Sequence, residues 1–99
     1  MNTSRAVLAK FGDFIEQGFA ELDRAGVPCG PDEVARVGTG ALRQLTIAEL
    51  ESLRAWARAG TSRTHQIIAV ECDLTLRAID REQHQRRTRL RRWWRHRPF

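Results

Sequence analysis

Several features that define common classes of protein are missing from this 99-residue sequence. No stretch approaches the ~18 consecutive apolar residues that a transmembrane helix needs, so no membrane span is expected. The start of the chain does not resemble a signal peptide, because Asp13, Glu16 and Gln17 interrupt its apolar residues. Two cysteines are too few for a disulfide framework, which agrees with a reducing compartment. Together, these absences predict a cytoplasmic protein.

The sequence also lacks the side-chain patterns on which catalysis and metal binding depend. Cys29 and Cys72 have no CxxC spacing, and none of the three histidines has another histidine one helical turn away. No GxSxG, HExxH or Walker motif is present. We therefore expect no enzyme activity, no bound metal and no cofactor. Cys29 is expected in a loop, Cys72 in the core and the histidines at the surface.

Acidic residues are nearly absent from the C-terminal end of the sequence. Residues 81–99 hold eight arginines and one glutamate, a net charge of +7. Residues 1–80 hold nine basic and eleven acidic residues, a net charge of −2. This asymmetry predicts a polyanionic partner, which would be nucleic acid, an anionic membrane face or an acidic protein.

Apolar residues at helical spacing predict three helices, over residues 5–25, 31–44 and 47–59. Gly18 falls on the apolar face of the first helix, where it would let another backbone approach closely. A capping box that starts at Thr46 begins the third helix, whose inward stripe is Leu50, Leu53, Trp56 and Ala57. With a last helix near the C-terminus, the predicted fold is all-α or mainly α, a small bundle of four or five helices.

Residues 64–80 allow two interpretations. A strict alternation favours a short strand at about 66–72 that pairs across a dimer, and it is made by Ile68, Val70, Cys72, Leu74 and Leu76. A helical spacing favours instead a short helix over 62–71 and a turn over 72–75, and it is made by Ile68, Cys72, Leu76 and Ile79. Under either interpretation the last helix starts near 74–76, packs at its start and becomes solvated later.

The charge boundary divides the chain into a single helical domain over residues 1–85 and a basic, Arg- and Trp-rich tail over residues 86–99. Arginines of the tail can pair with phosphates and its indoles can stack on bases. Leu90 and Trp94 could equally cover a neighbouring helix. The predicted nucleic-acid-binding residues are Arg77, Arg81, Arg86, Arg87, Arg89, Arg91, Arg92, Trp93, Trp94, Arg95 and Arg97.

Four short strings between residues 21 and 80 carry a resemblance to a known family. They are Ala25-Gly26-Val27, Asp32-Glu33-Val34, Leu45-Thr46-x-x-Glu49-Leu50-x-x-Leu53 and Ile68-x-Val70-x-x-Asp73. These strings resemble the FlhD/FlhC-type flagellar master-regulator subunits and related regulators of integrating conjugative elements. The resemblance implies a mostly helical, obligately oligomeric DNA-binding activator that works with a partner subunit. The cysteine cluster that places zinc in the FlhC-type subunit is absent from this sequence.

A second set of residues lies within 45–81 and consists of Leu45-Thr46-x-x-Glu49, Leu53, Ala57, Gly60, Ile68-Ala69, Leu74-Thr75 and Ala78-Ile79. This set is similar to a LuxR-type helix-turn-helix. The similarity implies that Thr75 caps a recognition helix, from which Arg77, Arg81 and His84 face the major groove of duplex DNA.

Both resemblances imply a DNA-associated transcriptional regulator. We also expect a homo-oligomer or a hetero-oligomer with a partner regulator subunit, because the apolar content of 64–79 exceeds what three helices can cover. The competing hypothesis is a small protein-binding inhibitor or accessory factor from a phage or conjugative element. In that case the acidic body would be the binding face.

Overall fold

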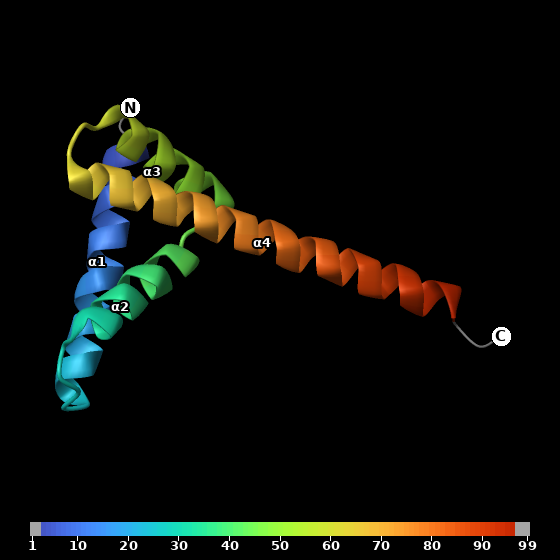
Figure 1. Ribbon diagram of the computed structural model, residues 1–99, viewed down its shortest axis with the longest axis horizontal. Coiled ribbons are helices and arrows are strands. Elements are labelled where there is room, and N and C mark those ends of the chain that lie inside the picture. Colours follow the sequence, from blue (N-terminus) through green and yellow to red (C-terminus); the bar gives the residue numbers. More distant parts are fainter. Residues whose placement is uncertain (1–2, 97–99) are drawn as a thin grey trace.

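The computed structural model describes residues 3–96, which form four α-helices joined by short connections (Figure 1). The helices are α1 (Thr3–Arg24), α2 (Pro31–Arg43), α3 (Ile47–Ala59) and α4 (Arg63–Arg95). Within this described part of the chain there is no strand. The predicted all-α fold is therefore confirmed, and the first three helices begin and end within two residues of their predicted bounds.

The core lies where the four helices meet. Leu50 and Leu53 of α3 and Cys72 of α4 are completely buried, and the buried cluster also includes Val7, Leu42 and Leu45. The predicted inward stripe of α3 is confirmed, because Ala57 is buried as well and Trp56 packs against the cluster. A small core built mainly from aliphatic side chains thus holds α4 against α3.

The predicted capping box begins α3. The Glu49 N–H donates to the Thr46 hydroxyl at 3.1 Å, and the Thr46 N–H donates to the Glu49 carboxylate at 2.9 Å. The same carboxylate accepts a hydrogen bond from Lys10 Nζ of α1, also at 2.9 Å. The cap therefore joins α1 to α3 in addition to starting a helix.

Gly18 is the point where α1 approaches α2 closely. A Cβ built on Gly18 would lie 2.8 Å from Val37 Cγ1 and 3.2 Å from Val37 Cγ2. The expected close approach is therefore present, but a side chain of α2 makes it where a backbone was expected.

Residues 63–95 form one continuous helix, so the predicted strand over 66–72 and the alternative turn over 72–75 are both wrong. The last helix begins after the N-cap Ser62 and not near 74–76. A helix pairs its own backbone groups, whereas a lone strand among helices would leave its groups unpaired. The helical stripe packs on the core, while Val70 and Leu74 of the alternating pattern lie outside, 56% and 51% exposed.

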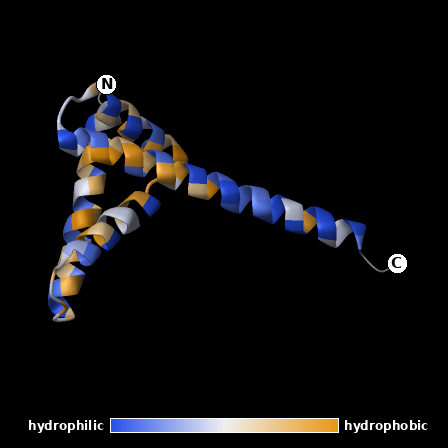
Figure 2. Cartoon of the chain, viewed as in Figure 1, coloured by the Kyte–Doolittle hydropathy of each residue, from blue (hydrophilic) through white to orange (hydrophobic). Residues whose placement is uncertain are grey.

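α4 extends well beyond the other three helices (Figure 1). Glu82 is the furthest described residue of α4 with a salt bridge to another helix, its Oε1 lying 3.4 Å from Arg43 Nη1. From His84 to Arg95 every side chain is exposed except that of Thr88, which is partly exposed. We call residues 84–95 the arm and residues 3–83 the body. Figure 2 shows the colour of α4 change from largely orange in the body to predominantly blue along the arm.

Candidate nucleic-acid interface

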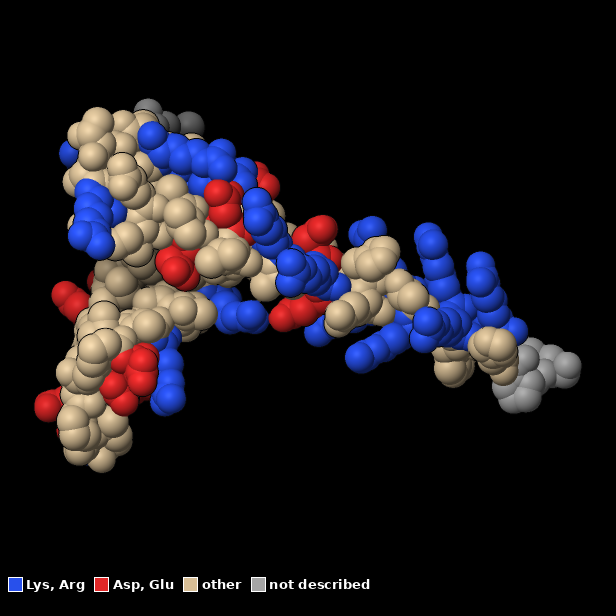
Figure 3. All heavy atoms as spheres, viewed as in Figure 1, with Lys and Arg blue, Asp and Glu red and all other residues tan. Residues whose placement is uncertain are grey.

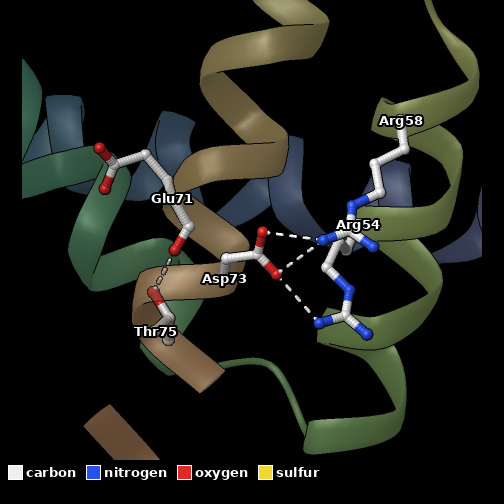
Figure 4. Close-up of polar contacts among 5 residues, drawn as sticks. All are labelled: Arg54, Arg58, Glu71, Asp73 and Thr75. Carbon is white, nitrogen blue, oxygen red and sulfur yellow. Dashed lines mark hydrogen bonds and ion pairs between the residues drawn. The ribbon is translucent and has the colours of Figure 1, made fainter. Parts of the chain in front are cut away.

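Asp73 of α4 forms ion pairs with two arginines of α3 in the body (Figure 4). Its Oδ1 accepts a hydrogen bond from Arg54 Nη1 at 3.0 Å, and its Oδ2 accepts one from Arg58 Nη2 at 3.0 Å. The hydrogen bond from Arg54, reinforced by Arg58, lowers the pKa of the Asp73 carboxyl below its usual value. This ion-pair cluster is one of the contacts that hold α4 against α3.

Thr75 lies inside α4 and does not cap a recognition helix. Its hydroxyl donates to the Glu71 carbonyl oxygen at 2.8 Å, one turn earlier in the same helix (Figure 4). The turn that a LuxR-type helix-turn-helix needs before Thr75 is therefore not formed. The expectation that Thr75 starts a separate recognition helix is wrong.

The arm gathers most of the predicted site residues. Its twelve residues are about 18 Å long at ~1.5 Å per residue. They include six exposed arginines and no acidic residue. Figure 3 shows the blue side chains concentrated along this projection, while the red ones lie on the body and near its junction with the arm. The six are Arg86, Arg87, Arg89, Arg91, Arg92 and Arg95.

A row of arginines also joins the body to the arm. At about 100° per residue, Arg77, Arg81, Arg92 and Arg95 fall within an arc of about 60° on the side of α4 opposite Cys72. All four are exposed. Continuity of α4 therefore brings Arg77 and Arg81, which the LuxR-type resemblance placed toward the major groove, onto the same face as two arginines of the predicted tail. Arg97 lies outside the described residues.

The arm also has an apolar side. Leu90, Trp93 and Trp94 are 59%, 58% and 61% exposed, and the two indole rings meet edge to face with centroids 5.4 Å apart. At ~100° per residue, Leu90 and Trp94 lie on the side of α4 that carries Cys72 and Leu76 into the core. The stripe that the body buries therefore continues along the arm, where it is exposed.

The body carries an apolar groove that was not predicted from the sequence. α1, α2 and α4 enclose a groove of about 480 Å³. Its lining includes Phe11, Phe19, Val34 and Ile67, and Glu71 is its only charged side chain among the described residues. Val34 and Ile67 are 50% and 54% exposed. The surplus of apolar residues over 64–79 was the available signal, but it did not identify the helices that form the groove.

The cysteines occupy the predicted kinds of position. Cys29 is exposed in the connection between α1 and α2, and Cys72 is buried. Burial raises the pKa of the Cys72 thiol to about 11, so this thiol is protonated at neutral pH and is a poor nucleophile. Within residues 3–96, no three His, Cys, Asp or Glu side chains are gathered as the ligands of a metal ion would be.

Comparison with known proteins identified no relative: no protein-family model, no curated protein and no solved structure matches the chain. The resemblance to FlhD/FlhC-type regulators therefore stays a prediction that rests on the strings quoted for it. None of the four described helices combines the length and the apolar content required to cross a membrane.

Proposed function

We propose that this protein binds nucleic acid through the arm and acts as a DNA-associated regulator of transcription. The arm itself carries the proposal, because six exposed arginines without an acidic residue stand on a helix that projects from the body. The preceding residues, 1–83, hold ten basic and twelve acidic residues. A polyanion is therefore attracted to the arm and not to the body. Phosphate contacts from arginine supply most of the affinity in such binding.

A single cationic helix suits the major groove of duplex DNA. An α-helix with its side chains is about 10–12 Å across, and the groove is about 12 Å wide with phosphates along both edges. Arginines that point to several sides of the arm, such as Arg87, Arg89 and Arg91, can therefore reach both strands. Trp93 would anchor the segment where a base is unstacked, because aromatic side chains stack on exposed bases.

The arm gains stability from a polyanion. Arg87, Arg91 and Arg95 follow one another at intervals of four residues, a spacing at which like charges repel on a helix. An isolated helix of this length is marginal in water. Phosphates that neutralise the arginines remove the repulsion, so binding to nucleic acid and helix formation in the arm reinforce each other.

The salt dependence of duplex binding tests this proposal. If about four arm arginines each neutralise one phosphate, the logarithm of the binding constant falls with the logarithm of salt concentration at a slope near −3.6. Replacing Arg87, Arg89, Arg91 and Arg92 by Gln should remove most of that slope in anisotropy titrations of a labelled duplex.

The matched control replaces four exposed body arginines by Gln, which changes the net charge equally. These arginines are Arg5, Arg24, Arg36 and Arg63. The control variant should keep the wild-type slope. An equal loss of slope in both variants would mean that net charge, and not the arm, governs binding, and the proposal would fail.

A protein-binding accessory factor or inhibitor is the second candidate function. The apolar groove beside α4 favours it, because exposed Val34 and Ile67 offer a surface on which another protein can bury apolar side chains. Absence of duplex binding by the full chain at low salt would move the assignment to this class.

A further inference from the structure

The apolar side of the arm and the apolar groove of the body cannot meet within one chain. α4 is unbroken, and Leu90 lies 23 residues beyond Ile67, which corresponds to about 35 Å along the helix axis. Figure 1 shows the arm pointing away from α1, α2 and α3. Contact between these two surfaces therefore requires two copies of the chain.

We propose that the groove receives Leu90 and Trp94 of a second copy of this chain. The groove of about 480 Å³ is of the size that holds bulky apolar groups, since binding pockets commonly span ~300–1,000 Å³. Leu90 and Trp94 expose more than half of their surface on one side of the arm. Large aromatic side chains that enter an apolar pocket are typical anchors of protein interfaces.

Charge complementarity identifies the occupant as a second copy. Residues 11–39, which supply most of the groove, hold six acidic residues and two arginines, a net charge of −4, although these charged side chains surround the groove and Glu71 alone lines it among the described residues. The arm has six arginines and no acid. Arg86 lies one turn before Leu90 on the same side of the helix, so entry of Leu90 carries this guanidinium toward the groove, where Glu71 is the one charged side chain of the described lining. The chain thus carries both an apolar groove within an acidic segment and an arm that combines arginines with apolar side chains.

The inference does not depend on the proposed function. Arg92 and Arg95 lie on the opposite side of the arm from Leu90 at ~100° per residue. An arm that is seated in a second copy therefore still presents these arginines to phosphates. Exchange of both arms closes a two-fold dimer, because each copy supplies one arm and one groove.

Sedimentation of the full chain over a range of concentrations tests the proposal. We expect the wild-type chain to self-associate. Ile67→Glu in the groove, or Leu90→Ala with Trp94→Ala in the arm, should raise the dissociation constant about tenfold or more. Leu74→Glu is the matched control, because Leu74 is 51% exposed on the same helix but does not line the groove. It should associate like the wild type.

Mixing the two defective variants provides a second readout. Ile67→Glu keeps an intact arm and the Leu90→Ala/Trp94→Ala chain keeps an intact groove. A mixed dimer therefore has one intact arm–groove contact, and an equimolar mixture should associate more tightly than either variant alone. All three substituted positions are more than half exposed, and circular dichroism checks that helix content is unchanged.

Three results would overturn the proposal: a wild-type chain that stays monomeric at every concentration, an equal loss of association in Leu74→Glu, or no recovery on mixing. A monomeric chain that still binds DNA with the expected salt slope would refute this inference and leave the proposed function standing. A chain that self-associates through arm and groove without binding DNA would support this inference and refute the proposed function.

Discussion

At the scale of single residues, two carboxylates join helices that are distant in sequence. Glu49 links the start of α3 to Lys10 of α1, and Asp73 links α4 to Arg54 and Arg58 of α3. Their side chains are only 22% and 27% exposed. The hydrogen bond from the Thr46 backbone, followed by that from Lys10, lowers the pKa of Glu49, and hydrogen bonds from Arg54 and then Arg58 lower that of Asp73.

These lowered pKa values make the fold sensitive to acid. A carboxyl group whose folded pKa lies below its unfolded value stabilises the fold fully above the unfolded value, and that stabilisation is lost as pH falls through the lowered one. The ordinary values are 4.5 for Glu49 and 3.8 for Asp73. We therefore expect the free energy of unfolding, measured with urea by circular dichroism, to be constant above these values and to decline below them.

The combined variant Glu49→Gln with Asp73→Asn should be less stable at neutral pH and should show a flatter acid dependence. Glu16→Gln serves as the control, because Glu16 is exposed and belongs to none of the salt bridges described above. It should keep the wild-type profile. If the free energy of unfolding of the double variant declined in acid as steeply as that of the wild type, other groups would be responsible for the sensitivity.

At the scale of elements, the pairing of α1 with α2 depends on one glycine. A Cβ at Gly18 would overlap the branched side chain of Val37, whereas a Cβ at Gly12 in the same helix meets nothing within 4 Å. Gly12→Ala should stabilise the chain by about 0.5–1 kcal/mol through helix propensity alone. Gly18→Ala gains the same propensity but adds an overpacking cost of about 1–3 kcal/mol.

The thermal and urea unfolding midpoints of Gly12→Ala should therefore rise and those of Gly18→Ala should fall. The free energies of unfolding of the two variants should differ by more than the gain from helix propensity. Equal stabilisation by both alanines would show that α2 moves away from α1 at little cost, so that Gly18 is not a determinant of their packing.

The helices also differ in how far the local sequence predicts them. α1, α2 and α3 were predictable because a helical apolar stripe, a Pro at the start of α2 and the capping box at Thr46 are local signals. α4 was not, because Val70 and Leu74 lie on its outside and, with Ile68, Cys72 and Leu76, add an alternating pattern to the helical one. Periodicity alone cannot separate the two when both faces are apolar.

The candidate site was predictable in composition and not in shape. Counting charges identified the arginines of residues 86–95, but whether they extend from the body depends on where α4 begins. The groove and the Lys10–Glu49 pair arise from contacts between helices far apart in sequence. Nothing in the local sequence around Lys10 selects Glu49 over the other carboxylates of the chain.

At the scale of the whole molecule, the arm makes the chain much more extended than its length requires. The radius of gyration is 17.3 Å, and the principal extents are 55 × 38 × 23 Å. A compact domain of this length has a radius of gyration of about 13 Å. The difference is a property that scattering measures directly.

Removal of the residues after Gln85 should change the shape without weakening the fold. The hydrophobic cluster draws on α4 only as far as Ile79, so the truncated chain keeps its core. At a concentration low enough to keep the full chain monomeric, small-angle scattering should give a clearly smaller radius of gyration, and the urea midpoint should stay at the value of the full chain. A markedly lower midpoint would show that the arm contributes to the stability of the body.

The continuity of α4 has a mechanical consequence. The helix that supplies Cys72 to the core is the same helix that carries Arg95, with no interruption between them. The angular position of every arm residue around the helix axis is therefore fixed relative to that of the core residues. While α4 stays helical, it has no turn at which the arm could rotate independently of the core residues.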